Sequence, residues 1–473
     1  MKKIAGLFFI TACVHLNAQQ PAGSFLVPPY LQIGTGSTVT TLTLLWHAAD
    51  NQGKWNVEYE SGGKWINATE PEPTRIAVKN IATHYVYRSI FSSLIAGKKF
   101  KYRVSLNGNQ VFSTEAQSPK NNSQSSRFTI FGDIGAGTKE AKEIAGGVYR
   151  SNPDLVIVPG DIVYDYGLIT DYRKKFWPIY NTDNAANGVP LMQSVPMVGA
   201  VGNHDADSRD LDKAPDALAY YYYWDQPLNG PVGEEGSAIV PLLKGEESNK
   251  KAFYEGAGKR YPRMTNFSFN YGNAHWLVLD ADTYVNWTDS SLLDWVRKDL
   301  SAAQSSAWRF VTFHHPGFNS SVEHYEQQQM RLLAPLFEKG NVDIVFSGHV
   351  HNYQRSYPMT FAPFGKGTMM AGGKDGKTPR GRVVPGHWAL DKTFDGTNNK
   401  QPKGVIYVIT GAGGQELYNP EQQNDRDSWQ PFTSKFISTV HSFTVVDVDG
   451  KTATIKQLDA TGKTLDSFSV AKP

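Results

Sequence analysis

The sequence predicts an all-β sandwich followed by a larger α/β domain. In residues 25–117, short runs of alternating apolar and polar side chains are separated by turn sequences, as in a β-sandwich. From residue 127 onward, apolar strands alternate with amphipathic helical stretches, which is the pattern of a layered α/β domain. The chain has 473 residues, more than one compact core usually holds, so a division into domains is expected.

Residues 1–18 predict a secretory signal peptide, because two lysines precede a short apolar stretch and the small residue Ala18 stands before polar sequence. Cleavage after Ala18 would make the mature protein secreted or periplasmic. Cleavage before Cys13, at a site that resembles those of bacterial lipoproteins, would instead leave a lipid anchor on Cys13 at the cell surface. We favour Ala18, since the apolar run before Cys13 is short for a signal core. No later apolar run approaches the roughly 18 residues of a transmembrane span.

Composition and motif content exclude several functional classes. The net charge of +2 predicts no strong electric field and therefore no nucleic-acid partner. The sequence contains neither the His-Glu-x-x-His motif of zinc proteases nor the Gly-x-Ser-x-Gly motif of serine hydrolases. The chemistry therefore has to come from other combinations of residues.

The first domain is predicted from three alternating runs, whose apolar positions are Leu42, Leu44 and Trp46, then Trp55, Val57 and Tyr59, then Phe100, Tyr102 and Val104. The segment 94–102 resembles the late-strand signature of fibronectin type III-like domains. None of these runs carries clustered polar chemistry, so a structural role is expected. A polar stretch at 115–126 predicts the linker to the next domain.

The α/β domain is predicted over residues 127–473. Apolar runs indicate strands at 127–132, 154–159, 195–201, 275–280, 309–313 and 343–347. Apolar residues at helical spacing predict helices over 288–303 and 324–339, and the chain returns to predicted strands after residue 404. Two irregular stretches, 206–262 and 357–403, fit neither pattern and are interpreted as insertions that border the active site.

Five motifs place metal-binding residue types at or just after predicted strands. They are Gly132-Asp133-Ile134-Gly135, Gly160-Asp161-Ile162-Val163-Tyr164, Gly202-Asn203-His204-Asp205, Val311-Thr312-Phe313-His314 and Gly348-His349-Val350-His351. Each alone could be an ordinary turn or a core residue. The carboxyl ends of strands meet at one edge of an open α/β sheet, so the motifs are expected to converge. Their carboxylates, amide, phenol and imidazoles fit two adjacent metal ions.

Strand geometry gives expectations for three of the histidines. In an extended segment, His349 and His351 point to the same side, so both can reach one site. His315, next to His314, points to the opposite face of its strand and is interpreted as structural.

With these five motifs in this order, the chain resembles the metallophosphoesterases of the calcineurin-like superfamily. Tyr164, three residues after Asp161, resembles the purple acid phosphatases in particular, as does the fibronectin type III-like domain in front. The resemblance implies a layered α-β-β-α sandwich and two metal ions. It implies Fe(III) bound by Asp133, Asp161, Tyr164 and His351, and a divalent ion (Zn, Mn or Fe(II)) bound by Asp161, Asn203, His314 and His349.

The resemblance also implies roles around the substrate. His204 and Asn203 would contact the phosphate, and His324 would be the catalytic acid that protonates the leaving group. Two positions depart from the family: Asp205 stands where most members carry Glu, and Glu323, in the substrate site, stands where many plant members carry His. Glu323 brings an anion into that site and is expected to raise the pKa of His324.

The function expected from this resemblance is that of a secreted acid phosphatase. A metal-bound hydroxide would attack the phosphorus of a small-molecule phosphomonoester in line, with His324 as the leaving-group acid. A phosphodiesterase that uses the same site, with residues 206–262 shaping the pocket, is one alternative. A non-catalytic surface-binding protein with a vestigial metal site is another, and the complete ligand set argues against it.

Overall fold

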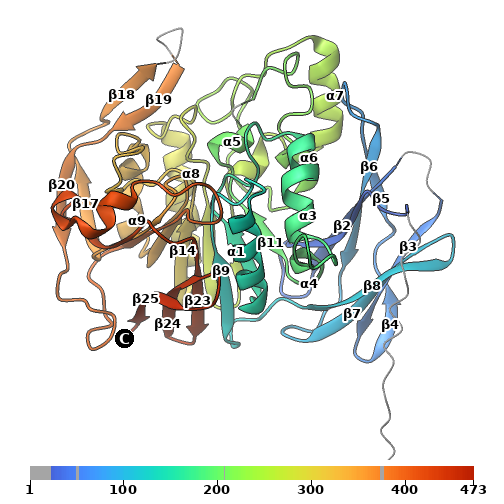
Figure 1. The fold of residues 1–473 in the computed structure, drawn as a ribbon, viewed down its shortest axis with the longest axis horizontal. Helices are drawn as coiled ribbons and strands as arrows, with labels where there is room; N and C mark the ends of the chain where they lie inside the picture. Colours follow the sequence, from blue (N-terminus) through green and yellow to red (C-terminus); the bar gives the residue numbers. More distant parts are fainter. Residues whose placement is uncertain (1–22, 50–52, 207, 373–377) are drawn as a thin grey trace, which may run out of the picture.

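The computed structural model describes residues 23–49, 53–206, 208–372 and 378–473. The predicted signal peptide and Cys13 lie outside the described residues. Within these ranges, no helix is both long and apolar enough to cross a membrane. Figure 1 shows the N-terminal strands on one side of a larger body that is built from the rest of the chain.

The N-terminal region consists of two four-stranded antiparallel sheets. One contains, in spatial order, β1 (Val27–Gln32), β2 (Leu42–Ala49), β6 (His84–Phe91) and β5 (Glu72–Ile76). The other contains β4 (Lys64–Asn67), β3 (Trp55–Ser61), β7 (Lys99–Leu106) and β8 (Asn109–Gln117). The alternating apolar residues of the sequence form the common core, where Trp46, Trp55 and Tyr102 are buried. This region fits the predicted fibronectin type III-like sandwich, although β8 continues to Gln117, inside the predicted linker.

The larger body is built on two mixed sheets. The six-stranded sheet has the order β11 (Met197–Gly199), β10 (Leu155–Val158), β9 (Ser126–Ile130), β23 (Ser442–Asp449), β24 (Thr452–Asp459) and β25 (Thr464–Ala471). The seven-stranded sheet has the order β12 (Phe267–Tyr271), β13 (Ala274–Val278), β14 (Trp308–Thr312), β15 (Ile344–Ser347), β21 (Ile406–Thr410), β16 (Tyr353–Ser356) and β22 (Thr433–Ile437). The runs β9–β10–β11 and β13–β14–β15–β21 are parallel.

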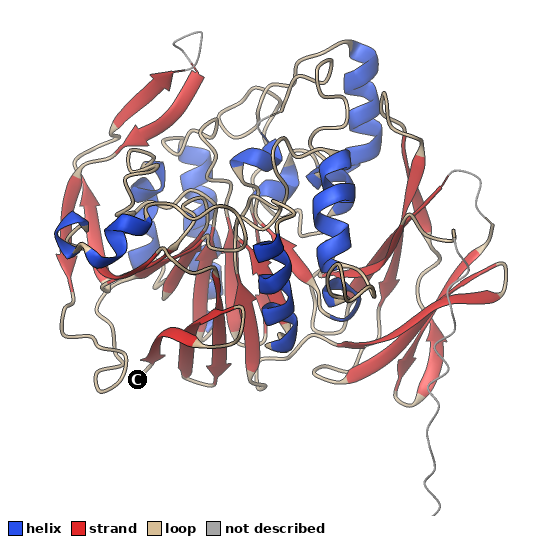
Figure 2. Ribbon diagram, in the orientation of Figure 1, coloured by secondary structure: helices blue, strands red, loops and turns tan. Residues whose placement is uncertain are grey.

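Apolar side chains from both sheets form one shared core, which includes Phe128, Ile157, Trp276 and Phe346. Figure 2 shows helices on the outer sides of the strands. Helix α1 (Lys139–Arg150) begins where the Thr138 hydroxyl accepts a backbone N–H, and α8 (Ser290–Ala302) begins at the carboxylate of Asp289 in the same way. The predicted α-β-β-α layering is confirmed.

The stretch 206–262 contains α6 (Tyr220–Tyr223) and α7 (Glu247–Ala257), and residues 216–227 within it are buried. The side chains of the four tyrosines in α6 are buried. Tyr223 reaches the N-terminal sheets, where its hydroxyl lies 3.0 Å from His84 Nε2 and its carbonyl accepts a 2.8 Å hydrogen bond from Tyr30. Part of this stretch therefore joins the two regions of the molecule.

Part of the stretch 357–403 is regular, which corrects the sequence interpretation. It forms two two-stranded antiparallel sheets. One pairs β17 (Met359–Pro363) with β20 (Gly386–Leu390), and the other pairs β18 (Thr368–Gly372) with β19 (Thr378–Val383). The β18–β19 pair stands out from the body beside the edge where the predicted metal-site motifs gather (Figure 1).

The predicted helix over 324–339 is wrong in its first part. Residues 329–333 form a 3-10 turn, and only α9 (Ala334–Lys339) is α-helical. His324 has a φ of 60°, which a helix does not allow. Of the apolar residues at helical spacing, Leu336 and Phe337 lie in α9, whereas Leu332 and Leu333 lie in the 3-10 turn before it.

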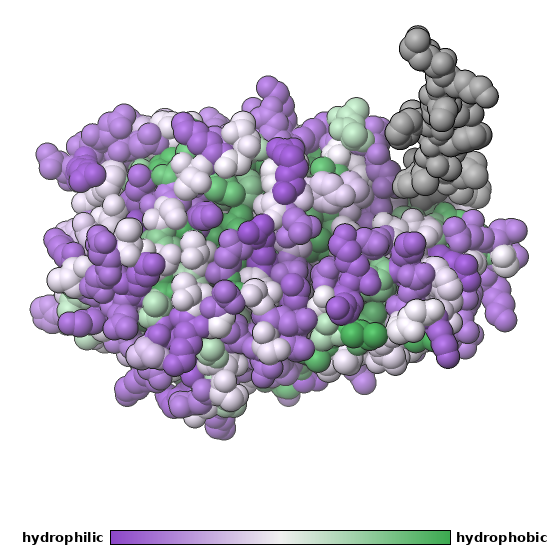
Figure 3. Space-filling model, turned by 90° about the horizontal axis from the view of Figure 1, so that it is seen from below, coloured by the Kyte–Doolittle hydropathy of each residue, from purple (hydrophilic) through white to green (hydrophobic). Residues whose placement is uncertain are grey.

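The remaining elements are short. They are α2 (Ile169–Asp171), α3 (Trp177–Tyr180), α4 (Leu191–Ser194), α5 (Asn203–Ala206), a π-helical turn (Tyr172–Phe176), and 3-10 turns at Gly258–Arg260, Arg263–Thr265, Ala303–Ser305, Pro420–Asn424 and Arg426–Ser428. On the face seen in Figure 3, hydrophilic side chains cover most of the surface, and apolar ones show between them.

Candidate metal centre

All five predicted motifs follow strands of the two central sheets and meet at one edge. Their residues come after β9 (Asp133), β10 (Asp161 and Tyr164), β11 (Asn203 and His204), β14 (His314) and β15 (His349 and His351). Three of them have left-handed backbone conformations, with φ of 61° at Asp133, 51° at Asp161 and 67° at His349. Such conformations are uncommon for residues other than glycine and cluster at functional sites.

One half of the site joins a carboxylate, a phenol and an imidazole. The Tyr164 hydroxyl donates to Asp133 Oδ1 at 3.1 Å and lies 3.2 Å from His351 Nε2. His351 Nε2 is also 3.4 Å from Asp133 Oδ1. The other ring nitrogen of His351 lies 2.8 Å from the carbonyl oxygen of Glu416. A carbonyl can only accept, so His351 Nδ1 carries a proton and Nε2 turns toward the site.

The other half surrounds His314, whose Nε2 has three close neighbours. They are Asp161 Oδ1 at 3.2 Å, Asn203 Oδ1 at 3.1 Å and His349 Nδ1 at 3.2 Å. His314 Nδ1 lies 2.8 Å from the carbonyl oxygen of Pro159 and therefore donates to it. Four potential acceptor atoms thus crowd together, and only the two ring nitrogens among them can carry a proton.

This donor set fits metal ions. A metal bound to nitrogen and oxygen at about 2.0–2.2 Å holds tetrahedral ligands roughly 3.4 Å apart, close to the separations around His314. Ligand atoms of Asp161, His314 and His349 all lie within 4.8 Å of one another. Carboxylate and phenol oxygens suit a hard ion such as Fe(III), whereas imidazole and amide suit Zn, Mn or Fe(II).

The electrostatics of the site also indicate a cation. Burial would lower the pKa of His314, but the carboxylates of Asp161 and Asp133 outweigh it and raise that pKa to about 10. Burial, together with the same two carboxylates, raises the pKa of Tyr164 well above its usual value. The site therefore carries an excess of negative charge, which must be balanced by a proton or by a metal ion.

His204 lies beside this centre and is half-buried. Its backbone N–H donates to Asp161 Oδ1 at 3.0 Å, its Nδ1 lies 2.8 Å from the carbonyl oxygen of Asp165, and its ring is 4.4 Å from that of Tyr164. The next residue, Asp205, is buried and accepts backbone N–H groups from the Asp161 loop, including that of Ile162 at 3.2 Å. Asp205 therefore ties α5 to the loop that carries Asp161.

His324 lies against the second half of the site. Its ring centre is 4.0 Å from that of His349 and 5.6 Å from that of Tyr418. Burial lowers the pKa of His324, and the charge of Glu323, which acts in the opposite direction, does not reverse this. Glu323 therefore raises the pKa of His324 in the expected direction, but burial lowers it by more. Glu323 itself is exposed.

Two expectations from strand geometry are also wrong. His349 and His351 do not lie in an extended segment, and they face different halves of the site. His315 does not turn away from the site, because β14 ends at Thr312 and strand alternation no longer applies. Its buried ring lies 4.1 Å from that of His349.

Sequence reasoning missed two side chains that contact proposed ligands. Tyr418 stacks on His351 with ring centres 4.0 Å apart and 15° between the planes, and the amide of Gln327 hydrogen-bonds to His349. A signal for the first was present, since Gly411 and the glycines after it directly follow the apolar run of β21. A Cβ on Gly411 would lie 2.7 Å from Asp133 Oδ2, so this strand end also borders the site. The sequence around Gln327 contains no pattern that indicates its contact with His349.

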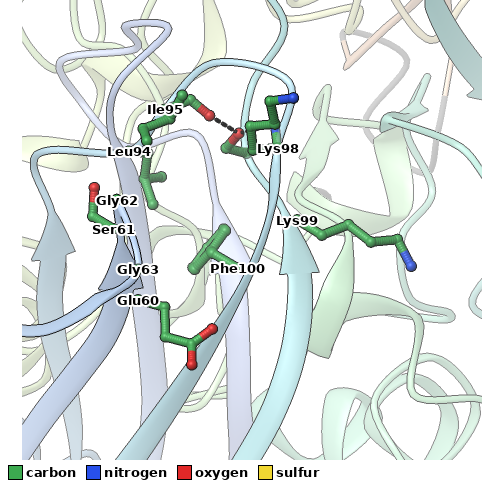
Figure 4. A pocket seen from close by; sticks show the side chains of 10 residues that line it. Glu60, Ser61, Gly62, Gly63, Leu94, Ile95, Lys98, Lys99 and Phe100 are labelled. Carbon is green, nitrogen blue, oxygen red and sulfur yellow. Dashed lines mark hydrogen bonds between the residues drawn. The ribbon is translucent and has the colours of Figure 1, made fainter.

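A small pocket of about 100 Å³ lies elsewhere, between strands of the N-terminal sheets (Figure 4). It is lined by residues such as Glu60, Lys98 and Phe100, and a hydrogen bond from Ser118 to the carbonyl of Ile95 closes one side. None of the residues of the five motifs lines it. It is therefore not part of the candidate metal centre.

Comparisons with known proteins identify the domain that contains these residues. Residues 126–353 match the family model for calcineurin-like phosphoesterases, and this range holds all five motifs. The chain is 24% identical to purple acid phosphatase 18 of Arabidopsis thaliana over 67% of this chain and 63% of that protein. It is also 24% identical to the phosphoenolpyruvate phosphatase of Allium cepa, over 66% of this chain and 59% of that protein.

The aligned part spans less than two thirds of these relatives, and as little as 41% of purple acid phosphatase 15. The fold is similar to that of purple acid phosphatase PPD1 from yellow lupin seeds, with a TM-score of 0.63 and 17% identity over 94% of this chain and 74% of that one. It is similar to PhoD with a TM-score of 0.55 and 11% identity over 96% and 94%. The chain therefore carries a calcineurin-like phosphoesterase domain and is a homologue of the purple acid phosphatases.

Proposed function

We propose that this protein is a two-metal acid phosphatase that hydrolyses phosphomonoesters. The observation that carries the proposal is the convergence of two sets of acceptor groups on either side of Asp161. Asp133, Tyr164 and His351 form one set, and Asn203, His314 and His349 form the other. Asp161 would be shared, because it lies next to His314 and also affects the pKa of Tyr164.

The oxygen-rich set would hold Fe(III), and the nitrogen-rich set would hold Zn, Mn or Fe(II). When bound, such a pair of ions supplies Lewis acidity toward phosphate oxygens and lowers the pKa of water. Burial and the carboxylates of Asp161 and Asp133 favour protons on His314 and Tyr164, and a bound cation would take the place of these protons.

The other residues of the site would act on the substrate. His204 is half-buried beside Asp161 and would bind a phosphate oxygen, together with Asn203. His324 would donate a proton to the departing oxygen of the ester. Glu323 would stand at the rim, where it meets the part of the substrate that leaves. Residues 127–473 would form the catalytic unit and residues 25–117 would support it.

Metal analysis and a substrate panel test the proposal on the purified full chain. We expect two metal ions per chain, iron among them, with the visible charge-transfer absorption of a tyrosinate bound to Fe(III). We also expect faster hydrolysis of nitrophenyl phosphate than of bis(nitrophenyl) phosphate at acidic pH. Failure to hydrolyse either ester with both metals bound would overturn the proposal, and a preference for the diester would establish the phosphodiesterase alternative instead.

We propose that the protein is exported from the cell, because residues 1–18 predict a signal peptide. Fractionation of the source organism should find the protein outside the cytoplasm without its first 18 residues. If the mature protein instead begins at a Cys13 that carries lipid, the protein is a lipoprotein and not a secreted protein.

A further inference from the structure

We infer that Gln327 is a positioning residue that fixes the tautomer of His349 by connecting this ring to the backbone of β19. The inference deepens the proposed function, because it rests on His349 being a metal ligand. It concerns a residue that touches neither substrate nor metal and acts through its neighbour.

The orientation of the Gln327 amide follows from its two partners. Its Nε2 donates to the carbonyl oxygen of Arg380 at 2.9 Å, and a carbonyl can only accept. The amide oxygen must therefore be the atom in contact with His349 Nε2. Because that oxygen also can only accept, His349 Nε2 carries the proton and donates it. The other ring nitrogen, Nδ1, is then free of a proton and lies 3.2 Å from His314 Nε2, inside the site.

Strand β19 holds Gln327 firmly in place. The neighbouring Gln328 donates its backbone N–H to the carbonyl of Arg382 at 2.9 Å, and its side-chain oxygen accepts the N–H of Val384 at 3.0 Å. Gly381 allows the close approach, since a Cβ at this position would lie 2.9 Å from Gln327 Cγ. The stretch 357–403 thus supports the metal centre through two consecutive glutamines.

His349 differs from the other two predicted imidazole ligands in how its second nitrogen is held. His314 and His351 donate to the backbone carbonyls of Pro159 and Glu416, which no side-chain substitution removes. His349 donates to a side chain. Partners of this kind orient a ligand and raise its basicity, and their loss typically costs about 10- to 100-fold in metal affinity. A substitution of Gln327 can therefore remove the hydrogen bond that fixes the tautomer of His349, without changing those of His314 and His351.

The test compares the metal affinity of three variants by competition with a chromophoric chelator, with zinc as the probe for the divalent site. Gln327→Leu removes the acceptor and should weaken zinc binding about 10- to 100-fold, without loss of iron. Gln327→Glu keeps an oxygen that accepts from His349 but loses the donor to the Arg380 carbonyl, so it should lose less zinc affinity than Gln327→Leu. Gln328→Leu is the matched control, because it removes the side-chain hydrogen bond to Val384, just after β19, without touching His349, and it should leave zinc affinity unchanged.

The inference would be overturned if Gln327→Leu binds zinc as tightly as wild type, if Gln327→Glu loses as much affinity as Gln327→Leu, or if Gln328→Leu loses it equally. The last result would mean that packing of the hairpin, not the tautomer, holds the metal. Thermal unfolding of each metal-free variant shows whether it is folded. Failure of the proposed function would show in wild type, as metal binding without phosphatase activity, and would leave these affinity differences intact.

Discussion

Two groups of buried histidines in this protein differ in the chemical groups that surround them. His314, His349 and His351 turn a ring nitrogen toward carboxylates, a phenol and one another. His47 and His84, at the contact between the N-terminal sheets and α6, face tyrosine hydroxyls instead, each at 3.0 Å. All five imidazoles are buried, so burial alone does not distinguish a ligand from a structural residue.

The difference lies in the charge of the neighbours. Around His314, two carboxylates raise the pKa above its usual value despite burial. Around His84, burial and the guanidinium of Arg173 lower the pKa to about 4. Burial likewise lowers the pKa of His47, and His84 and Arg173 add to the effect. In this comparison, the carboxylates beside His314 favour a positive charge at the site, whereas His47 and His84, beside hydroxyls and a guanidinium, stay neutral and hold two surfaces together.

Replacing Asp161, the carboxylate proposed to bind both metal ions, should have the largest effect. It removes part of the negative charge that distinguishes the first group of histidines from the second. Asp161→Asn is expected to lower the occupancy of both metal ions and to reduce phosphatase activity at least ~10⁴-fold, or roughly 5.5 kcal/mol. Metal analysis and kinetics check this. Asp447→Asn, which breaks an ion pair with Arg127 in the same sheet, is the control and should retain both metals. One fully occupied site in Asp161→Asn would contradict the shared role.

His324 tests whether a histidine at the border of the first group gives a proton to the substrate. General acid catalysis contributes about 10²- to 10⁴-fold, and mostly when the leaving group is a strongly basic alkoxide. His324→Ala should therefore slow alkyl phosphates by about that factor and nitrophenyl phosphate far less. His324→Gln, which is polar but cannot act as an acid, should behave like the alanine variant. Equal losses on both substrates would mean that His324 only positions the phosphate.

The second group of histidines should make the protein sensitive to acid. The pKa of His84 is about 4 in the fold against a usual 6.5, so between these values the unfolded chain binds more protons. Stability is therefore present above pH 6.5 and is lost as the pH falls toward 4. For His84 the loss amounts to ~2.5 kcal/mol between pH 7.5 and 4.5.

Replacement of His84 by a residue that does not titrate should remove most of the loss of unfolding free energy that His84 contributes between pH 7.5 and 4.5. Urea unfolding of His84→Phe at pH 7.5 and 4.5 measures it, with His387→Phe, at an exposed position on β20, as the control. If His84→Phe and wild type lose the same free energy of unfolding between the two pH values, His84 does not carry the acid sensitivity.

The sequence predicted the parts of the molecule whose signals are local. Apolar runs located the central strands, and polar residues at their ends located Asp133, Asp161 and the other proposed ligands. The errors lie where a distant segment decides the conformation. His324 and Gln327 are held by Tyr418 and β19, both more than 50 residues away along the chain. Nor does the alternating pattern around His47, which lies in β2, reveal that this ring faces a tyrosine hydroxyl and not a carboxylate.

The smallest expected effect concerns Glu323, the exposed anion next to His324 that we propose stands at the rim of the site. It is exposed, so its charge acts through water and is worth no more than about 1 kcal/mol. Glu323→Gln should therefore raise kcat/KM for a nucleoside triphosphate by at most about five-fold, and for nitrophenyl phosphate by less, because the triphosphate brings more negative charge to the rim. The gain should shrink at high salt, which screens exposed charges. Glu326→Gln, an exposed neighbour, controls for net charge, and an equal gain in that variant would mean that Glu323 has no special place at the site.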